Sequence, residues 1–222
     1  SKKYKSPNEY MEFITQNGGS TNAFTAAEQT TYLFSINNKK FAPALDRLSA
    51  AIMEPLFDGT MVEKEINAVN SEWLKNRQTD AFIQQRTLAL TGNPSHPRVK
   101  LGVGNKDTLG SNEEQLLGSL RDFHEKFYSA NLMKLVLVGN QSSKELAKLA
   151  RKYFSNIKNS KVERPVNNIS AYREKDLSKE IFIRSKVKSP IFLVEFPIKD
   201  NRNLWKSKPN QYIAKLINSQ ED

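Results

Sequence analysis

The stretch Glu65-Ile66-Asn67-Ala68-Val69-Asn70-Ser71-Glu72 places two carboxylates seven residues apart on one predicted helix. Seven residues make nearly two helical turns, so both side chains project from the same side. At the edge of a buried helix face, a carboxylate can bind a cation or act as a general base. Most glutamate pairs on helices are solvated, so the spacing alone favours a surface role. The two glutamates flank an apolar stripe made of Val62, Ile66, Val69 and Trp73.

The segment Asn67–Glu72 resembles the part of the pitrilysin and insulin-degrading enzyme family that carries the distal zinc-ligand glutamate. Members of this family are zinc peptidases with an inverted His-x-x-Glu-His motif. The similarity runs over almost the whole chain and is greatest to the bacterial branch of the family. Further stretches resemble family blocks, in the family's order: Ser1–Tyr4, Gly18–Ser20 with Asn22-Ala23, Ala44–Leu48, Glu54–Leu56, Asn93–Pro97, Gly104-Asn105, Asp122–Lys126, Tyr128–Lys134 and Trp205–Pro209.

The resemblance implies a role for each glutamate of the pair. Glu72 matches the distal zinc ligand, and Glu65 matches a glutamate that supports the zinc-binding histidines. Phe82 falls where the family tends to place an aromatic side chain near the primed side of the substrate, although packing within its helix explains it equally well.

The resemblance also implies a peptide-binding strand. A free strand edge offers main-chain donors and acceptors to any extended peptide, so such binding depends little on the peptide's sequence. The residues that match the substrate-binding edge strand of the family are Asn22, Ala23, Phe24 and Thr25.

The catalytic motif itself is missing from these residues. The two histidines, His96 and His124, stand in no His-x-x-Glu-His arrangement. In the family this motif precedes the block matched by Ser1–Tyr4, so we expect the general-base glutamate upstream of Ser1 and the chain to be an internal fragment. Catalytic zinc needs about three protein ligands. We therefore expect Zn²⁺ in the intact parent protein, none stably bound by this fragment, and no peptidase activity from the fragment alone.

Composition narrows the possible partners. The net charge is +10, with about +2 in residues 1–110 and +8 in residues 111–222. The lysines are scattered without interleaved aromatics, which favours a solvated basic surface over a nucleic-acid site. No apolar run is long enough to span a membrane. Cysteine is absent, which excludes disulfides and thiolate sites but does not separate cytoplasm from periplasm. The resemblance implies a periplasmic parent protein.

We predict an α+β fold, a mostly antiparallel sheet with helices packed on one face. Residues 1–165 are expected to form a pitrilysin-like catalytic-type domain without its first strands and zinc-motif helix, and residues 166–222 the beginning of a second, similar domain. The boundary is the polar stretch 155–170, which is typical of a linker. Strands are expected within 22–36 and at Leu135–Val138, 179–186 and 190–197.

The helices have recognisable starts and stops. Ser6, Pro7 and Glu9 predict a capped first helix that ends at Gly18-Gly19. A second helix is expected to stop before Pro55, and one long helix to cover 61–90. Residues 91–111 are expected to be a loop. Capping boxes predict helices after Ser111 and Ser142, with His124 packed on the first of these, and a last helix is expected around Tyr212.

Two functions are consistent with these residues and with the resemblance. The leading interpretation is a fragment of a zinc metalloendopeptidase that hydrolyses short or unfolded peptides in an enclosed chamber. The alternative is a non-catalytic peptide-binding or structural domain of the same architecture. In either case the expected partners are peptides and the remaining domains of the same polypeptide, with no nucleic acid and no membrane.

Overall fold

The fold combines eight α-helices with one β-hairpin in the part of the chain described by this computed structural model, residues 1–100, 102–110, 112–186, 191–198 and 200–219. The predicted α+β class with an antiparallel sheet is confirmed. The α-helices and strands are α1 (Glu9–Gln16), β1 (Ser20–Thr25), β2 (Thr30–Ser35), α2 (Phe41–Met53), α3 (Gly59–Asn76), α4 (Asp80–Thr91), α5 (Lys106–Leu109), α6 (Glu113–Phe127), α7 (Ser143–Phe154) and α8 (Pro209–Asn218). Short 3-10 turns are η1 (Asn38–Lys40), η2 (Pro97–Val99), η3 (Ala130–Leu132), η4 (Glu174–Asp176) and η5 (Arg202–Leu204).

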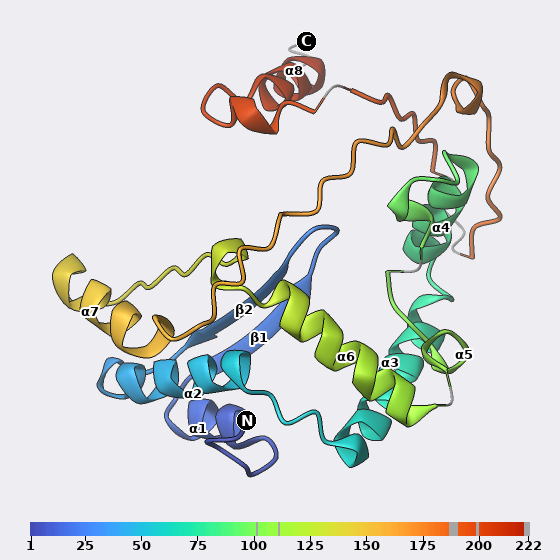
Figure 1. The fold of residues 1–222 in the computed structure, drawn as a ribbon. Helices are drawn as coiled ribbons and strands as arrows, with labels where there is room; N and C mark the ends of the chain where they lie inside the picture. The colour runs from blue at the N-terminus through green and yellow to red at the C-terminus, as the bar shows by residue number, and fades with distance from the viewer. Residues whose placement is uncertain (101, 111, 187–190, 199, 220–222) are drawn as a thin grey trace.

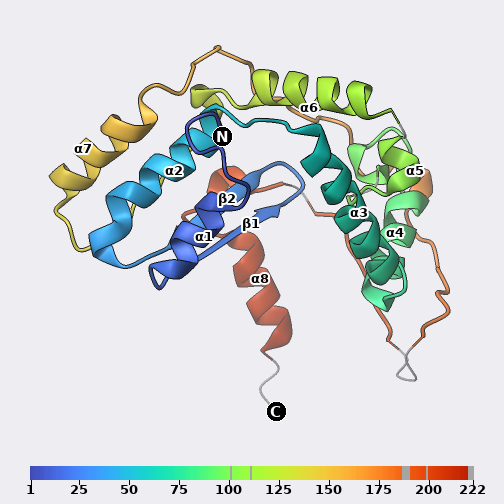
Figure 2. The same ribbon diagram turned by 90° about the horizontal axis from the view of Figure 1, so that it is seen from below.

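The hairpin lies beside α1 and α2, and α6 leads from it toward α3, α4 and α5 (Figures 1 and 2). Helix α7 packs on α2, while α3 packs on α6. None of the helices in the described part of the chain is both long and apolar enough to cross a membrane.

The predicted extended stretch 22–36 is a hairpin. Strands β1 and β2 pair from Ser20 with Ser35 to Thr25 with Thr30, and the Ala26 amide donates to the Gln29 carbonyl at 2.8 Å to close the turn. The ring of Phe34 packs against two others, with centroid distances of 6.4 Å to Tyr10 and 6.0 Å to Phe41. These contacts anchor one face of the hairpin to α1 and to the start of α2.

The predicted cap of the first helix is wrong, whereas its end is confirmed. Asn8, with a left-handed φ of 61°, stands at the N-cap position, and no side chain caps the helix there. The Glu9 carboxylate is drawn away because it accepts a hydrogen bond from Arg47 Nε at 2.8 Å. At the other end, Gly18 adopts a φ of 70°, and a Cβ on Gly19 would collide with the Ser35 carbonyl. Both positions therefore require glycine.

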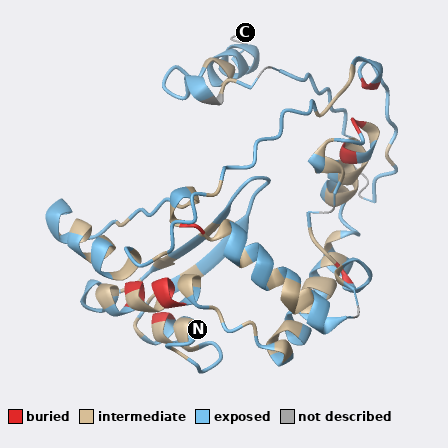
Figure 3. Cartoon of the chain, in the orientation of Figure 1, coloured by how far each residue is buried: buried red, intermediate tan, exposed pale blue. Residues whose placement is uncertain are grey.

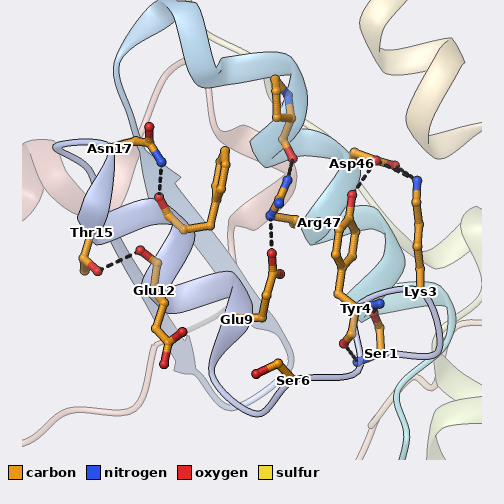
Figure 4. Close-up of polar contacts among 12 residues, drawn as sticks. Ser1, Lys3, Tyr4, Ser6, Glu9, Glu12, Thr15, Asn17, Asp46 and Arg47 are labelled. Atoms are coloured by element: carbon orange, nitrogen blue, oxygen red, sulfur yellow. Dashed lines mark hydrogen bonds and ion pairs between the residues drawn. The ribbon is translucent and has the colours of Figure 1, made fainter.

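A polar cluster ties the N-terminal segment to α2 (Figure 4). Asp46 accepts hydrogen bonds from Lys3 Nζ at 2.6 Å and from the Tyr4 hydroxyl at 2.7 Å. Partial burial raises the pKa of the Asp46 carboxyl, but the bonds from Lys3 and Tyr4 outweigh it and the pKa is lowered overall. Arg47 stacks over the rings of Tyr4 and Phe13. Two sequence blocks more than forty residues apart thus meet at one turn of α2.

The predicted single helix over 61–90 is wrong, because the chain breaks it into α3 and α4 after Asn76. The Thr79 hydroxyl accepts a hydrogen bond from the Phe82 amide at 3.3 Å and caps the second helix. A threonine side chain can satisfy the free amides of a helix start, so it competes with continuation of the preceding helix. The predicted loop 91–111 also contains η2 and the short helix α5.

The two later capping boxes differ in outcome. For α7 the prediction is confirmed, since Ser142 and Glu145 cap each other's backbone. For α6 the cap is Asn112, which accepts from the Gln115 amide at 3.0 Å; the predicted Ser111 lies outside the described residues. His124 is a packed residue, as predicted. Its Nε2 lies 2.7 Å from the Ile52 carbonyl oxygen, and its ring stacks on Tyr128.

The predicted strands at Leu135–Val138, 179–186 and 190–197 do not form within the described residues, and positions 187–190 lie outside them. The side chains of these segments are open to solvent: Val136 is 81% exposed, Val138 83% and Phe192 92%. A strand forms only when a neighbouring strand accepts and donates its main-chain hydrogen bonds. The apolar pattern is present, but no other described segment pairs with it.

The polar stretch 155–170 is held to the rest of the chain near each of its ends. The hydroxyl of the fully buried Ser129 accepts from the Ser160 amide at 2.9 Å, and Asn131 Nδ2 donates to the Val162 carbonyl at 2.8 Å. Farther along, the buried Asn93 donates its backbone amide to the Ala171 carbonyl and its side-chain amide to the Ser170 carbonyl, both at 2.9 Å. Ser129 and Asn93 are among the few buried polar residues of the described chain, whose buried positions are scattered over the fold (Figure 3).

The exposed apolar side chains predict self-association of the isolated chain. Large apolar surfaces on a single chain are removed from water by contact with a second copy. Sedimentation velocity is expected to show a weight-average mass that rises with concentration, and the double variant Phe192→Ser, Val194→Ser is expected to reduce it. A monomer at every concentration, with a melting temperature independent of concentration, would contradict this expectation.

Candidate functional site

Helix α3 holds the two glutamates at the border of its packed face. Asp58 caps the start of the helix, because its carboxylate accepts a hydrogen bond from the Thr60 amide at 2.9 Å. Glu65 and Glu72 are exposed, and Asn70 on the same helix accepts from the Lys106 amide at 3.2 Å to hold α5 in place. The stripe that packs toward α5 and α6 is half-buried and consists of Val62, Ile66, Val69 and Trp73.

The described residues do not by themselves form a zinc site. No cluster of three or more histidine, cysteine, aspartate or glutamate side chains occurs among them that could hold a metal ion. Glu65 and Glu72 supply carboxylates from one helix, whereas a catalytic zinc needs about three protein ligands. Neither carboxylate makes a hydrogen bond or an ion pair with another described residue, so both are available to groups that approach α3.

The outer edge of β1 is the second part of the candidate site. Antiparallel pairs alternate between residues that exchange hydrogen bonds and residues that do not. Because Ala26 bonds to Gln29, the register directs the backbone groups of Phe24 and Asn22 toward β2 and those of Ala23 and Thr25 outward. The Ala23 amide bonds only to the Asn22 side-chain oxygen, at 2.9 Å, among the described residues. This edge is therefore open to an added strand.

The aromatic candidate, Phe82, lies on α4 and not on the helix that carries the glutamates. It is half-buried near the start of α4, where its backbone amide donates a hydrogen bond to the Thr79 hydroxyl. The structure thus distributes the predicted site residues over three elements: Glu65 and Glu72 on α3, Phe82 on α4, and Asn22 to Thr25 on β1. No hydrogen bond or ion pair between described residues joins these three groups.

The contact between Tyr32 of β2 and Tyr128 was not predicted from the sequence. The hydroxyl of Tyr32, the pairing partner of Ala23, shares a hydrogen bond with the Tyr128 hydroxyl. Burial of Tyr128, reinforced by this bond, raises the pKa of its hydroxyl well above the ordinary value. The bond links the hairpin to the end of α6. Strand alternation indicated the face on which Tyr32 lies, but its partner is 96 residues away.

Two models of known protein families match the chain. The family model described as Insulinase (Peptidase family M16) matches residues 1–95, and the model described as Peptidase M16 inactive domain matches residues 116–220. The chain belongs to the insulinase (M16) peptidase family. The M16 matches lie on either side of residues 96–115, the region that contains η2 and α5.

Individual M16 members are similar over nearly the whole chain. Insulin-degrading enzyme of Homo sapiens is 37% identical over 232 residues, covering 97% of this chain and 22% of that protein. The A-factor-processing enzyme of Saccharomyces cerevisiae is 36% identical over 98% of this chain and 22% of its own length. Protease 3 of Escherichia coli (strain K12) is 37% identical over 98% of this chain and 23% of its own length. The chain thus spans about a fifth of the length of these relatives.

A solved structure agrees with the sequence matches. The crystal structure of pitrilysin superposes with a TM-score of 0.75 at 38% sequence identity, covering 79% of this chain and 19% of that one. The hairpin and helices described above therefore belong to the pitrilysin fold.

Membership of the M16 family, together with the two isolated carboxylates of Glu65 and Glu72, leads to a prediction about zinc. The isolated chain is expected to bind Zn²⁺ weakly by isothermal titration calorimetry, because one helix cannot surround the ion. The variant Glu72→Gln should change the free energy of unfolding by no more than about 0.5 kcal/mol, since an exposed side chain without partners is replaced. A stoichiometric, tight zinc site in the isolated chain would contradict this picture.

Proposed function

We propose that this chain is part of a zinc metalloendopeptidase. In the intact protein Glu72 would serve as one zinc ligand and Glu65 would support the other ligands, which lie outside this chain together with the general-base glutamate. A zinc ion in such a site activates a water molecule for peptide hydrolysis. The isolated chain is proposed to be inactive because it lacks these groups.

The position of Glu72 is the observation that carries this proposal. Glu72 borders the half-buried stripe of α3, on a helix held by contacts with α5 and α6. It has no partner among the described residues. A rigid helix that presents an unpartnered carboxylate meets the requirement for a preorganised ligand.

The substrate is proposed to bind along β1. The outward backbone groups of Ala23 and Thr25 would pair with an extended peptide, with Asn22, Phe24 and Phe82 contributing side chains. Main-chain pairing of this kind requires an unfolded segment. We therefore propose short or unfolded peptides as substrates, degraded within a chamber completed by the remaining domains of the polypeptide.

The proposal extends to organisation and compartment. Residues 1–165 would form the catalytic-type domain and residues 166–222 the beginning of the second domain. The exposed apolar side chains at 135–138 and 191–198 support further parts of the same polypeptide as partners. The similarity to bacterial Protease 3 supports a periplasmic location.

The test of the catalytic role is Glu72→Gln in the full-length protein. The variant should lose bound zinc, measured by atomic absorption, and peptidase activity should fall by at least about a thousandfold, because a missing ligand removes the activated water. The matched control is Glu63→Gln, which changes an exposed glutamate on another side of α3. Unchanged turnover in Glu72→Gln would rule the catalytic role out.

A non-catalytic peptide-binding domain is the second candidate, and the open edge of β1 is the observation that favours it. Binding along this edge would need no metal ion. Its test distinguishes loss of peptide binding at the edge from loss of the hydrogen bonds between β1 and β2.

In the full-length protein, Ala23→Pro removes an outward amide and should weaken binding of an extended peptide about tenfold, while leaving the β1–β2 bonds in place. Phe24→Pro removes an amide that faces β2 and should instead destabilise the hairpin. Fluorescence anisotropy measures the binding and thermal melting the stability. Peptide affinity unaffected by Ala23→Pro would exclude the β1 edge as the binding surface.

A further inference from the structure

Helix α7 carries a row of cations along its solvent face. Lys144, Lys148 and Arg151 recur at the four- and three-residue spacing that places side chains on one side of a helix, and Lys152 lies next to them. All four are exposed. We call these four residues the α7 cationic surface.

The neighbourhood of this surface adds positive charge. The Gln141 side-chain amide donates to Asn38 Oδ1 at 2.6 Å, which joins η1 to the loop before α7. The exposed Lys39 and Lys40 of η1 therefore lie near the N-terminal end of the helix. The one acidic residue of α7, Glu145, is already engaged, because its carboxylate accepts from the Ser142 amide at 2.9 Å and from the Ser142 hydroxyl at 2.7 Å.

No carboxylate among the described residues forms an ion pair with the α7 cationic surface. The described ion pairs involve other cations: Lys3, Arg47, Arg164, Arg173 and Lys179. Among the described aromatic side chains, Lys152 contacts only that of its neighbour Tyr153, with Nζ 5.1 Å from the ring centroid.

At the start of α7 this arrangement works against the stability of the helix, whereas Arg151 and Lys152 lie in its last turn, where cations are favourable. Like charges four residues apart repel each other. A lysine in the first turn, as Lys144 is, also faces the positive end of the helix dipole. An anionic partner would relieve both effects.

We propose that the α7 cationic surface binds acidic polypeptide segments. The spacing fits such a partner. Side chains four residues apart on a helix are about 6 Å apart along its axis, and alternate side chains of an extended peptide are separated by about 6.6 Å. A row of carboxylates on one side of an extended segment can therefore meet the row of cations. Such binding needs neither Glu72 nor zinc, so it is independent of the peptidase proposed above.

The surroundings of the helix favour a peptide over the other polyanions. The aromatic residues Tyr153 and Phe154 are half-buried on the side that packs toward α2, so no exposed ring is available for stacking on bases. Leu146 and Leu149 are half-buried on the same side, which leaves no apolar face for insertion into a lipid surface. The helix also lies far from α3 in both ribbon views (Figures 1 and 2), so an acidic segment bound there would not cover Glu72.

The test measures binding of a labelled glutamate-rich dodecapeptide to the whole chain by fluorescence anisotropy. Binding is expected at low salt, should weaken as salt shortens the screening length, and should be absent for the same peptide with glutamine at every glutamate. The triple variant Lys144→Gln, Lys148→Gln, Arg151→Gln should weaken binding about tenfold. The matched control Lys75→Gln, Lys100→Gln, Lys215→Gln removes the same charge elsewhere and should weaken it less than about twofold.

Several results would overturn the proposal. Equal losses in the two triple variants would show that only net charge matters. Displacement of the peptide by an equal charge concentration of single-stranded DNA, or of vesicles containing phosphatidylserine, would assign the surface to those partners. Acetylation footprinting of the unmodified chain tests the surface without any variant. The peptide should protect Lys144 and Lys148 but not Lys75, and equal modification with and without peptide would also refute the proposal.

Discussion

The packing of α2 against α1 and α7 is the contact on which the rest of the structure depends. Ile14 of α1 and Ala44, Leu45 and Leu48 of α2 are buried together with little or no exposure. Full burial of a leucine or isoleucine side chain contributes roughly 1.5–3 kcal/mol. The neighbouring residues Asp46 and Arg47 bind the N-terminal segment and the start of α1. One helix thus fixes both the core and the position of the hairpin.

Beyond this core, much of the apolar surface lacks a partner. Phe192 and Val138 are almost fully exposed, and both strands of the hairpin have an outer edge with which no described strand pairs. The relatives are more than four times as long as this chain. Apolar side chains and open strand edges are stable in contact with further protein. The same openness at β1 is what makes peptide binding there physically reasonable.

The polar stretch 155–170 shows how a few side chains can place a connection without regular structure. Ser129 and Asn131 hold its first part, and Asn93 holds the residues that follow. Farther on, the Arg173 guanidinium donates two hydrogen bonds to the buried Asp176 and the Arg173 backbone amide donates a third, and these bonds lower the pKa of that carboxyl. The path of the chain toward α8 is therefore set by a few side chains. Three of them, Asn93, Ser129 and Asn131, lie in sequence blocks that resemble the family.

The helices and several of their ends could be predicted because they depend on local interactions. Ser142 with Glu145 and the left-handed Gly18 act within a few residues of their own positions, and the apolar periodicity of α2 and α3 reports directly on their packed faces. Local signals failed where two of them competed. The Thr79 hydroxyl caps a second helix inside a continuous apolar pattern, and the Glu9 carboxylate accepts a hydrogen bond from Arg47 instead of capping the first helix.

By itself, the sequence determined the family, the α+β class, the hairpin's alternation and the position of both glutamates beside an apolar stripe. The family follows from the resemblance of an ordered series of sequence blocks, and the other features follow from side-chain period. Tertiary structure decided which extended segments pair as strands and which carboxylates form ion pairs. It also decided that Tyr32 forms a hydrogen bond with Tyr128. Those outcomes depend on groups distant in the chain, because main-chain pairing, burial and ion pairing each need a second surface that local sequence does not specify.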